Sequence, residues 1–347
     1  MTADVEQLRA ISQGLTSLNG SGDLPEVKVQ FRTGEDVYEA APETPDWLWH
    51  GYIAAGATTL FSGSQKSGKS TFLFALMRAF LDGHTRFVGH DVRPGRVILL
   101  TEEGDGTLRP KLEHITPTGR RELRVLGRND VAMNPLQWTQ AVHAACIEAL
   151  DTGARLVVID TFAFWSKIQD ENDTAGMQMA AAALAELTAS DLGVVIVHHH
   201  GKNAEARENG NASRGSTSLP ASVDIIVDLF RPEPFGNDEV PSNEREIRSI
   251  GRYPEIPEIL RVALDGDGTY RAVMEGTKDE VRQASAEQRV TEWFMDDWAG
   301  THSVADMSRD LGLSKGTVSK ACKKLIDEGL VERIGEGNRA RFRWVQK

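Results

Sequence analysis

Residues 57–70 read A-T-T-L-F-S-G-S-Q-K-S-G-K-S, an apolar run followed by a loop bounded by glycines. The segment from Gly63 to Ser70 fits the spacing G-x-x-x-x-G-K-[ST]. The two glycines permit backbone angles that other residues resist, so the loop can turn its N–H groups inward around phosphates. A helix that begins near Lys69 adds the positive end of its dipole. The stretch therefore predicts a strand, a phosphate-binding loop and a helix.

The loop residues have separate expected roles. Lys69 should reach the β- and γ-phosphates of ATP, and the hydroxyl of Ser70 should bind magnesium. We therefore expect ATP and Mg²⁺ as cofactors. The remaining expected nucleotide contacts are Gly63, Ser64, Gln65, Lys66, Ser67, Gly68 and Thr71.

Acidic residues end two further apolar runs. Asp160 follows Leu156–Ile159, so it should lie at the carboxyl end of a buried strand and hold magnesium through water. Glu102 and Glu103 follow Leu99-Leu100-Thr101. Two carboxylates there are costly unless they are solvated or face a cation. Glu102 is the candidate catalytic base, and Glu103 is the alternative.

Three histidines, His198, His199 and His200, end another apolar run, Val195–Val197. Successive strand residues alternate faces, so these side chains cannot converge on one metal ion. A sensor of the γ-phosphate or of the attacking water fits better. His199 is favoured, with His198 close behind and a purely structural role as the alternative.

The pattern between residues 46 and 276 alternates strands with helices, which predicts an α/β fold with a mostly parallel, helix-covered sheet. Expected strands are 57–61, 96–101, 156–160, 193–198 and 224–230, and expected helices are 70–81, 136–150 and 175–189. Three later runs should form a small antiparallel extension, at 245–252, 258–264 and 269–274. A polar, small-residue segment at 201–213 should be a mobile loop.

The C-terminal part predicts a winged helix: a long helix over 280–298, a helix-turn-helix over 303–329, and a hairpin over 330–345. Small hydroxyl and basic residues lead the second helix of the pair, which suits a recognition helix in the major groove of DNA. Arginines on alternate positions of the hairpin share one face and can follow a phosphate backbone. Protein contact is the alternative. The expected DNA-binding residues are Ser314, Lys315, Thr317, Lys320, Arg339 and Arg341.

Composition limits the classes of function. The 347 residues allow two or three domains, which we place at 1–45 (a polar lead-in), 46–276 (the ATPase domain) and 277–347 (a linker helix and the winged helix). The net charge is −12, but residues 301–347 hold ten lysines and arginines against six acidic residues, a net of +4. A small basic module thus ends an acidic body, which argues against coating nucleic acid with the whole surface.

Targeting and redox signals are weak. The two cysteines, Cys146 and Cys322, have no metal-ligand spacing and should be packed thiols. The N-terminal residues lack a basic start followed by an apolar run, and no stretch approaches a membrane helix. We therefore expect a cytoplasmic protein without membrane contact.

The chain resembles the RecA-like ATPases of the RepA type, which are hexameric replicative helicases of plasmids and phages, related to the DnaB and RecA ATPases. The resemblance covers residues 46–275. It rests on Gly63–Ser70 with Lys66, Thr101-Glu102-Glu103, Leu156–Thr161, His198-His199 with Lys202, and Arg214-Gly215-Ser216.

This resemblance implies a homo-oligomeric ring, possibly a hexamer, with ATP between neighbouring subunits. Glu102 would activate water, Asp160 would serve magnesium, and His199 would sense the phosphate. An arginine from the next subunit would stabilise the transition state, and both Arg214 and Arg252 compete for this role.

The extra winged helix departs from the RepA pattern and favours an initiator, loader or regulatory ATPase. The leading hypothesis is an ATP-hydrolysing motor or remodelling protein in DNA replication of a phage or mobile element. A DNA-binding regulator that uses ATP as an assembly switch is the main alternative. A third is an ATP-binding module whose winged helix binds protein.

Overall fold

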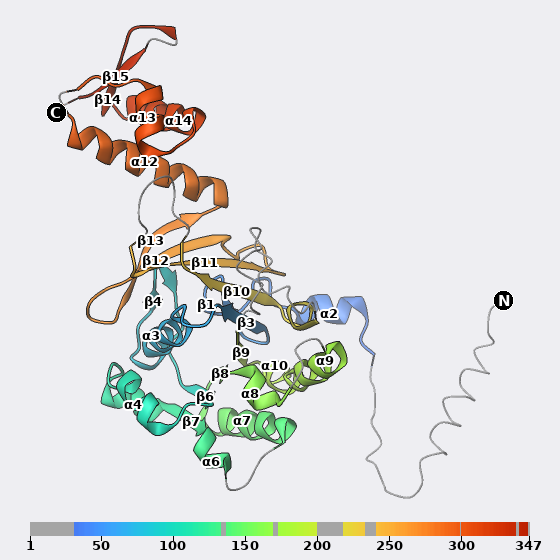
Figure 1. The fold of residues 1–347 in the computed structure, drawn as a ribbon. Helices are drawn as coiled ribbons and strands as arrows, with labels where there is room; N and C mark the ends of the chain where they lie inside the picture. The colour runs from blue at the N-terminus through green and yellow to red at the C-terminus, as the bar shows by residue number, and fades with distance from the viewer. Residues whose placement is uncertain are drawn as a thin grey trace, which may run out of the picture. The chain divides into compact units, whose positions relative to one another are not determined.

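The computed structural model describes residues 31–132, 137–168, 173–199, 218–232, 241–298, 300–337 and 340–345 (Figure 1). The chain divides into two compact units, residues 1–44 and residues 45–347. In the first unit, helix α2 (Gly34–Ala40) begins after Thr33, whose hydroxyl accepts a hydrogen bond from the Asp36 N–H at 3.1 Å. This capping box explains why so short a helix begins there.

The second unit is built on one large sheet, whose strand order is β13-β12-β11-β10-β3-β9-β8-β6-β7. These strands are β3 (Thr58–Gly63), β6 (Val97–Thr101), β7 (Leu123–Gly127), β8 (Leu156–Asp160), β9 (Gly193–His199), β10 (Ile225–Phe230), β11 (Glu244–Gly251), β12 (Ile259–Leu264) and β13 (Tyr270–Gly276). The strands from β10 to β7 run parallel, while β11, β12 and β13 pair antiparallel. The expected α/β architecture, with a mostly parallel sheet and an antiparallel extension, is confirmed, and it is consistent with a RecA-like core.

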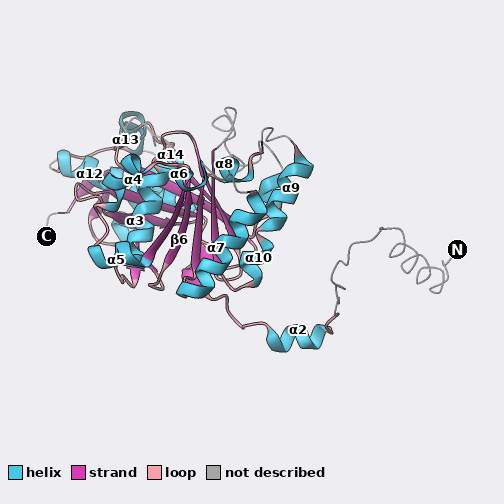
Figure 2. Cartoon of the chain, turned by 90° about the horizontal axis from the view of Figure 1, so that it is seen from below, coloured by secondary structure: helices cyan, strands magenta, loops and turns pink. Residues whose placement is uncertain are grey.

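Helices cover both faces of the parallel part of the sheet (Figure 2). One face carries α3 (Lys69–Leu81), α4 (Asp105–Leu112) and α5 (Pro117–Glu122), and the other carries α7 (Trp138–Thr152), α8 (Phe162–Ser166), α9 (Thr174–Ala183) and α10 (Ala185–Ala189). Shorter elements are α6 (Arg128–Ala132), α11 (Ser218–Ala221) and the two-stranded pairs β1 (Trp47–Trp49) with β2 (Ile53–Ala54) and β4 (Arg86–Phe87) with β5 (His90–Asp91). Each sheet face thus has its own apolar core, as the continuous apolar strands predict.

Two differences from the sequence prediction have physical causes. The helix expected over 175–189 is two helices, because Leu184 and Leu187 make i→i+3 bonds that tighten the chain where both side chains are buried. Strand β7 was not predicted. It is an edge strand whose Val125 is exposed, so its sequence lacks the continuous apolar run of the central strands.

The C-terminal part folds as a winged helix with its own core. Its elements are α12 (Lys278–Asp296), α13 (Val304–Leu311), α14 (Lys315–Asp327), β14 (Val331–Ile334) and β15 (Arg341–Trp344). Val318, Ala321, Cys322 and Leu325 bury one face of α14 against α12 and α13. The turn before α14 uses Gly312 with φ +66, which glycine adopts without strain. This confirms the predicted helix-turn-helix and hairpin.

Both cysteines are buried free thiols, as predicted. Among the described residues, no helix is long and apolar enough to cross a membrane.

Candidate nucleotide site and winged-helix surface

The glycine-bounded loop lies at the carboxyl end of β3, in the middle of the sheet, and leads into α3. Gly63 must be glycine, because a Cβ there would lie 2.6 Å from the Leu229 carbonyl oxygen on β10. Gly68 has φ +96 and is the N-cap of α3, a conformation that a side chain would strain. Lys66 also has a positive φ, +61. The loop therefore has the turned backbone that the sequence predicted.

The side chain of Lys69, the first residue of α3, points back into the preceding loop. Its Nζ donates to the carbonyl oxygens of Gly63 and Ser64, both at 2.7 Å. The residue is only 4% exposed, and burial lowers the pKa of its ammonium to about 8, against the opposing effect of the Asp160 carboxylate. Lys69 is thus a poorly hydrated cation whose partners are backbone dipoles.

Asp160 ends β8, next to the end of β6 in the sheet. It is 6% exposed. Burial, together with the nearby charges of Glu103 and Glu102, raises the pKa of its carboxyl group to about 6, against the opposing charges of Lys111 and Lys69. The end of these two strands therefore concentrates three carboxylates, an excess of negative charge that fits a bound cation.

Glu102 and Glu103 have different partners. Glu103 forms an ion pair with Lys111 of α4, which also lies 5.1 Å from the centre of the Phe74 ring. Glu102 instead accepts a hydrogen bond from the Thr161 hydroxyl at 3.2 Å. Lys111 was not among the predicted site residues, because no sequence motif marks the helix α4 that follows the glutamates. Of the two glutamates, Glu103 is the one that pairs with a lysine among the residues that the structure describes.

Of the three consecutive histidines, His198 and His199 are described, and they lie on β9, beside β3. His199 is in register with Gly63 and His198 with Ser62, so both flank the start of the loop. Ser62 donates a hydrogen bond to the buried Asp228 of β10. Both histidines are partly buried. His200 and Lys202 lie outside the described residues, as does the expected mobile loop at 201–213.

A cavity of about 420 Å³ lies along α3, starting at Thr71, one residue after the loop. One wall is a face of α3 that begins at Thr71 and includes Phe74 and Arg78, and another is the end of α4 with Pro110, Lys111 and His114. The turn between β12 and β13 closes it. An aromatic ring and lysine next to the phosphate loop make a space suited to a nucleoside.

Arg214 and Arg252, the two candidates for an arginine that acts on a neighbouring subunit, differ in what the structure says of them. Arg214 lies outside the described residues. Arg252 lies after β11, at the amino edge of the sheet, opposite the loop of its own chain. There it pairs with Asp224 at 2.9 Å and is largely exposed. The sequence analysis overlooked Arg245, whose Nε donates to the Ser67 carbonyl oxygen at 2.6 Å.

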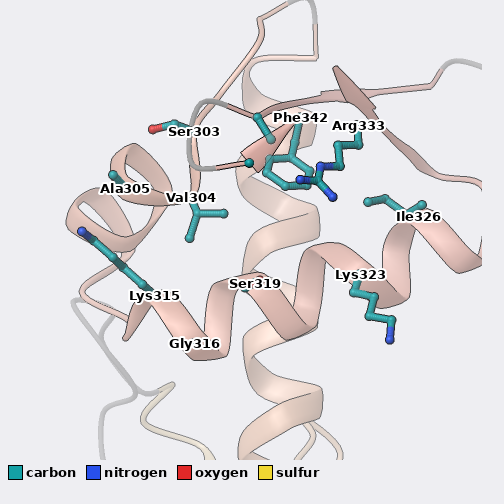
Figure 3. Close-up of a pocket in the computed structure, with 12 residues that line it drawn as sticks. Ser303, Val304, Ala305, Lys315, Gly316, Ser319, Lys323, Ile326, Arg333 and Phe342 are labelled. Atoms are coloured by element: carbon teal, nitrogen blue, oxygen red, sulfur yellow. The ribbon is translucent and has the colours of Figure 1, made fainter. Parts of the chain in front are cut away.

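The winged helix has a groove of about 760 Å³ between α13, α14 and the hairpin (Figure 3). Lys315, Ser319 and Lys323 of α14 line one side, and Arg333 of β14 lines the other. Within the described part of the chain, none of these three cations forms an ion pair. The groove is therefore a basic surface next to the helix that the sequence analysis selected.

Expected DNA contacts on α14 and the hairpin differ in their surroundings. Ser314 caps α14, because its hydroxyl accepts from the Thr317 N–H at 3.1 Å and lies 2.8 Å from the Thr317 hydroxyl. Lys320 is exposed. Arg341 donates to the Thr301 carbonyl oxygen at 3.0 Å. Arg339 lies outside the described residues.

The hairpin register separates its cations. Arg341 and Arg343 share the exposed face of β15, where Arg343 pairs with Glu332, while Arg333 lies opposite Phe342 on the face toward α14. Arg333 was missed, because only the register reveals which face it occupies.

Comparisons with known proteins agree with these two parts. A family model described as "AAA domain" matches residues 25–205, and one described as "MarR family" matches residues 297–341. No curated protein matches the chain. The chain thus carries a P-loop ATPase domain and a C-terminal winged helix of MarR type. Because the first match spans more than half of the 347 residues, this chain belongs to the AAA domain family.

Proposed function

We propose that this chain is a DNA-associated ATPase that couples hydrolysis of ATP to work on DNA, in the manner of RepA-type helicases or of related remodelling proteins. The observation that carries the proposal is the meeting of the phosphate loop, Glu102 and Asp160 at one edge of the sheet. Such a site provides both a triphosphate cradle and a carboxylate near the reacting phosphate. The ATPase domain spans residues 46–276 in this proposal, and the linker helix with the winged helix spans residues 277–347.

The nucleotide lies with its phosphates in the loop and its nucleoside in the 420 Å³ cavity that starts at Thr71. Lys69 binds the β- and γ-phosphates, in exchange for its bonds to the Gly63 and Ser64 carbonyls. Phe74 and Lys111 in the cavity suit the apolar base and its polar edge. Loop residues 64–68 contribute backbone N–H groups.

Magnesium fits the charge of the site. The hydroxyl of Ser70 and the carboxylate of Asp160 would hold it, since burial beside two glutamates leaves Asp160 short of compensating charge. Bound magnesium supplies charge neutralisation on the phosphate oxygens. The protein's own contribution is the position of these two oxygen ligands.

The water that attacks the γ-phosphate is activated by Glu102. Glu103 is less suitable as the base, because its carboxylate is already engaged in an ion pair with Lys111. His199, beside Gly63, senses the γ-phosphate, and an arginine of a neighbouring subunit, Arg214 or Arg252, stabilises the transition state. This last role requires a homo-oligomeric ring.

DNA is bound by the winged helix. The basic groove at α14 carries Lys315 and Lys323, and the exposed face of α14 adds Lys320. A MarR-type winged helix with unpaired lysines supports phosphate contact along the recognition helix. The module's charge of only +4 makes one copy a weak binder, and several copies in a ring would strengthen binding through avidity.

The basic groove also favours a second function, an ATP-switched DNA-binding regulator without translocation. Turnover of ATP by purified protein with and without single- and double-stranded DNA separates the two. A motor requires severalfold stimulation by single-stranded DNA and loss of turnover in Lys69→Ala. The absence of stimulation by any DNA would exclude the motor, whereas duplex binding that survives Glu102→Gln supports the regulator.

A further inference from the structure

Arg245 is the second residue of β11, at the edge of the sheet that carries the phosphate loop. Strand β11 runs antiparallel to β10, so its first residues lie opposite the end of β10, beside the loop. The guanidinium is held in three places. Its Nε donates to the Ser67 carbonyl oxygen at 2.6 Å, and its Nη1 donates to the carbonyl oxygens of Ser242 and Glu244 at 2.9 and 2.6 Å.

The bond to Ser67 determines how the following peptide faces. A peptide unit is planar and trans, so the carbonyl of Ser67 and the N–H of Gly68 point to opposite sides. A guanidinium that holds the carbonyl from outside the loop therefore directs the Gly68 N–H away from itself. Charge-assisted hydrogen bonds are stronger than neutral ones, and they polarise the amide at its other end.

The loop needs such a hold. Lys66 and Gly68 both have positive φ, and Gly68 begins α3 without any side-chain cap. A residue other than glycine, such as Lys66, keeps a positive φ only where its surroundings fix it. The Arg245 guanidinium lies beside Gly68, since a Cβ placed on Gly68 would be 3.4 Å from its Nε.

We infer that Arg245 is a positioning residue of the phosphate loop, which acts within its own chain by holding the Ser67–Gly68 peptide with its N–H toward the triphosphate. This inference rests on the proposed nucleotide site. It separates Arg245 from Arg214 and Arg252, which are proposed to act across a subunit boundary. Arg245 does not contact the reacting atoms, so its loss should weaken binding more than it slows chemistry.

The test is the affinity of the full-length chain for methylanthraniloyl-ATP with magnesium, together with kcat and KM for ATP. Arg245→Gln should weaken binding and raise KM about tenfold or more, as expected for one lost charge-assisted hydrogen bond. The kcat should stay within about twofold, since binding and not the chemical step is affected. Arg245→Lys, which keeps the charge but donates from a single nitrogen, should recover part of the affinity.

Two controls define the alternatives. Arg309→Gln on α13 removes an arginine of the winged helix, one that pairs with Asp306 on the surface, and should leave nucleotide binding unchanged. Lys69→Ala tests the site itself. If Lys69→Ala binds the analogue normally, the proposed function fails; if only Arg245→Gln binds normally, the proposed function stands and this inference is wrong.

A mixture of wild-type and Arg245→Gln subunits tests whether Arg245 acts within its own chain. Wild-type subunits should not restore the affinity of Arg245→Gln subunits, because the residue serves its own loop. Restoration on mixing, or an equal loss of affinity in Arg309→Gln, would contradict the inference. Equal melting temperatures of the wild type and the Arg245 variants would show that the loss of affinity is not unfolding.

Discussion

The fold of this chain disfavours the charged form of Asp160. Its carboxyl group has a pKa of about 6, against 3.8 in an unperturbed aspartate, because burial and two neighbouring glutamates disfavour its charge. Between these two pH values the folded protein holds a proton that the unfolded chain has released. The free energy of unfolding therefore falls as the pH rises from about 4 to 6, and the cost remains at neutral pH.

Replacing this carboxylate by a neutral amide should raise stability and abolish function. We expect Asp160→Asn to unfold at a higher temperature at pH 7 than the wild type, by about 2 kcal/mol of unfolding free energy. The gain should shrink as the pH falls from about 6 to about 4, where the wild-type carboxyl is protonated in the folded and the unfolded chain alike. Thermal unfolding at pH 7 and at about pH 4, without nucleotide, measures this. A variant less stable than the wild type at pH 7 would show that the carboxylate is well compensated.

Substitution of Glu102 and of Glu103 should have different effects on kcat for ATP hydrolysis. Glu102→Gln should lower kcat for ATP hydrolysis by about 100-fold or more and leave nucleotide binding intact, because it removes the base alone. Glu103→Gln loses the ion pair with Lys111 and should cost about tenfold or less. Steady-state kinetics of both variants provide the answer. The reverse order would assign the base to Glu103.

Some residues of the site were predictable and others were not. The phosphate loop follows a local spacing, and Asp160 follows a single apolar run, so both could be found without a fold. Arg245 and Arg333 have no such pattern. Each gains its position from strand register, which brings together residues far apart in sequence, 178 positions in the case of Ser67 and Arg245.

At the scale of elements, the buried strands and long helices followed from apolar runs and caps. Strand β8 has the predicted bounds, and α12, α13 and α14 begin within two residues of the prediction. The elements missed were those whose stability is tertiary. Strand β7 is stabilised by its pairing with β6, and the break at Leu184 by burial against the sheet. The alanine- and leucine-rich sequence there gives no local signal for a break.

The wing should show two classes of arginine. Arg333→Ala, in the groove beside α14, should weaken duplex DNA binding severalfold and reduce the dependence of log affinity on log salt concentration by about one. Arg343→Ala should have a smaller effect, since Glu332 already neutralises its guanidinium at 2.7 Å. Fluorescence anisotropy with labelled duplex at several salt concentrations distinguishes them. Equal slopes for the two variants would place the DNA on the outer face of the hairpin.

Each chain places the phosphate loop, Glu102 and Asp160 at the carboxyl ends of the parallel strands but directs Arg252 to the opposite edge of the sheet. An arginine at that edge is of no use to the loop of its own chain. In a ring, however, the far edge of one subunit can face the nucleotide of the next. The surface pair with Asp224 contributes little to stability, so Arg252 is available for such a role.

Mixed oligomers test this arrangement. Lys69→Ala and Arg252→Ala should each be nearly inactive alone, the first for lack of the phosphate-binding lysine and the second for lack of the arginine in the neighbouring site. In an equal mixture that exchanges subunits, about one site in four pairs an intact Lys69 with an intact Arg252 of the neighbour, so about a quarter of wild-type turnover should return. No recovery, with Arg252→Ala inactive, would place Arg252 in its own site. An active Arg252→Ala would transfer the role to Arg214, where the same mixture made with Arg214→Ala should recover instead.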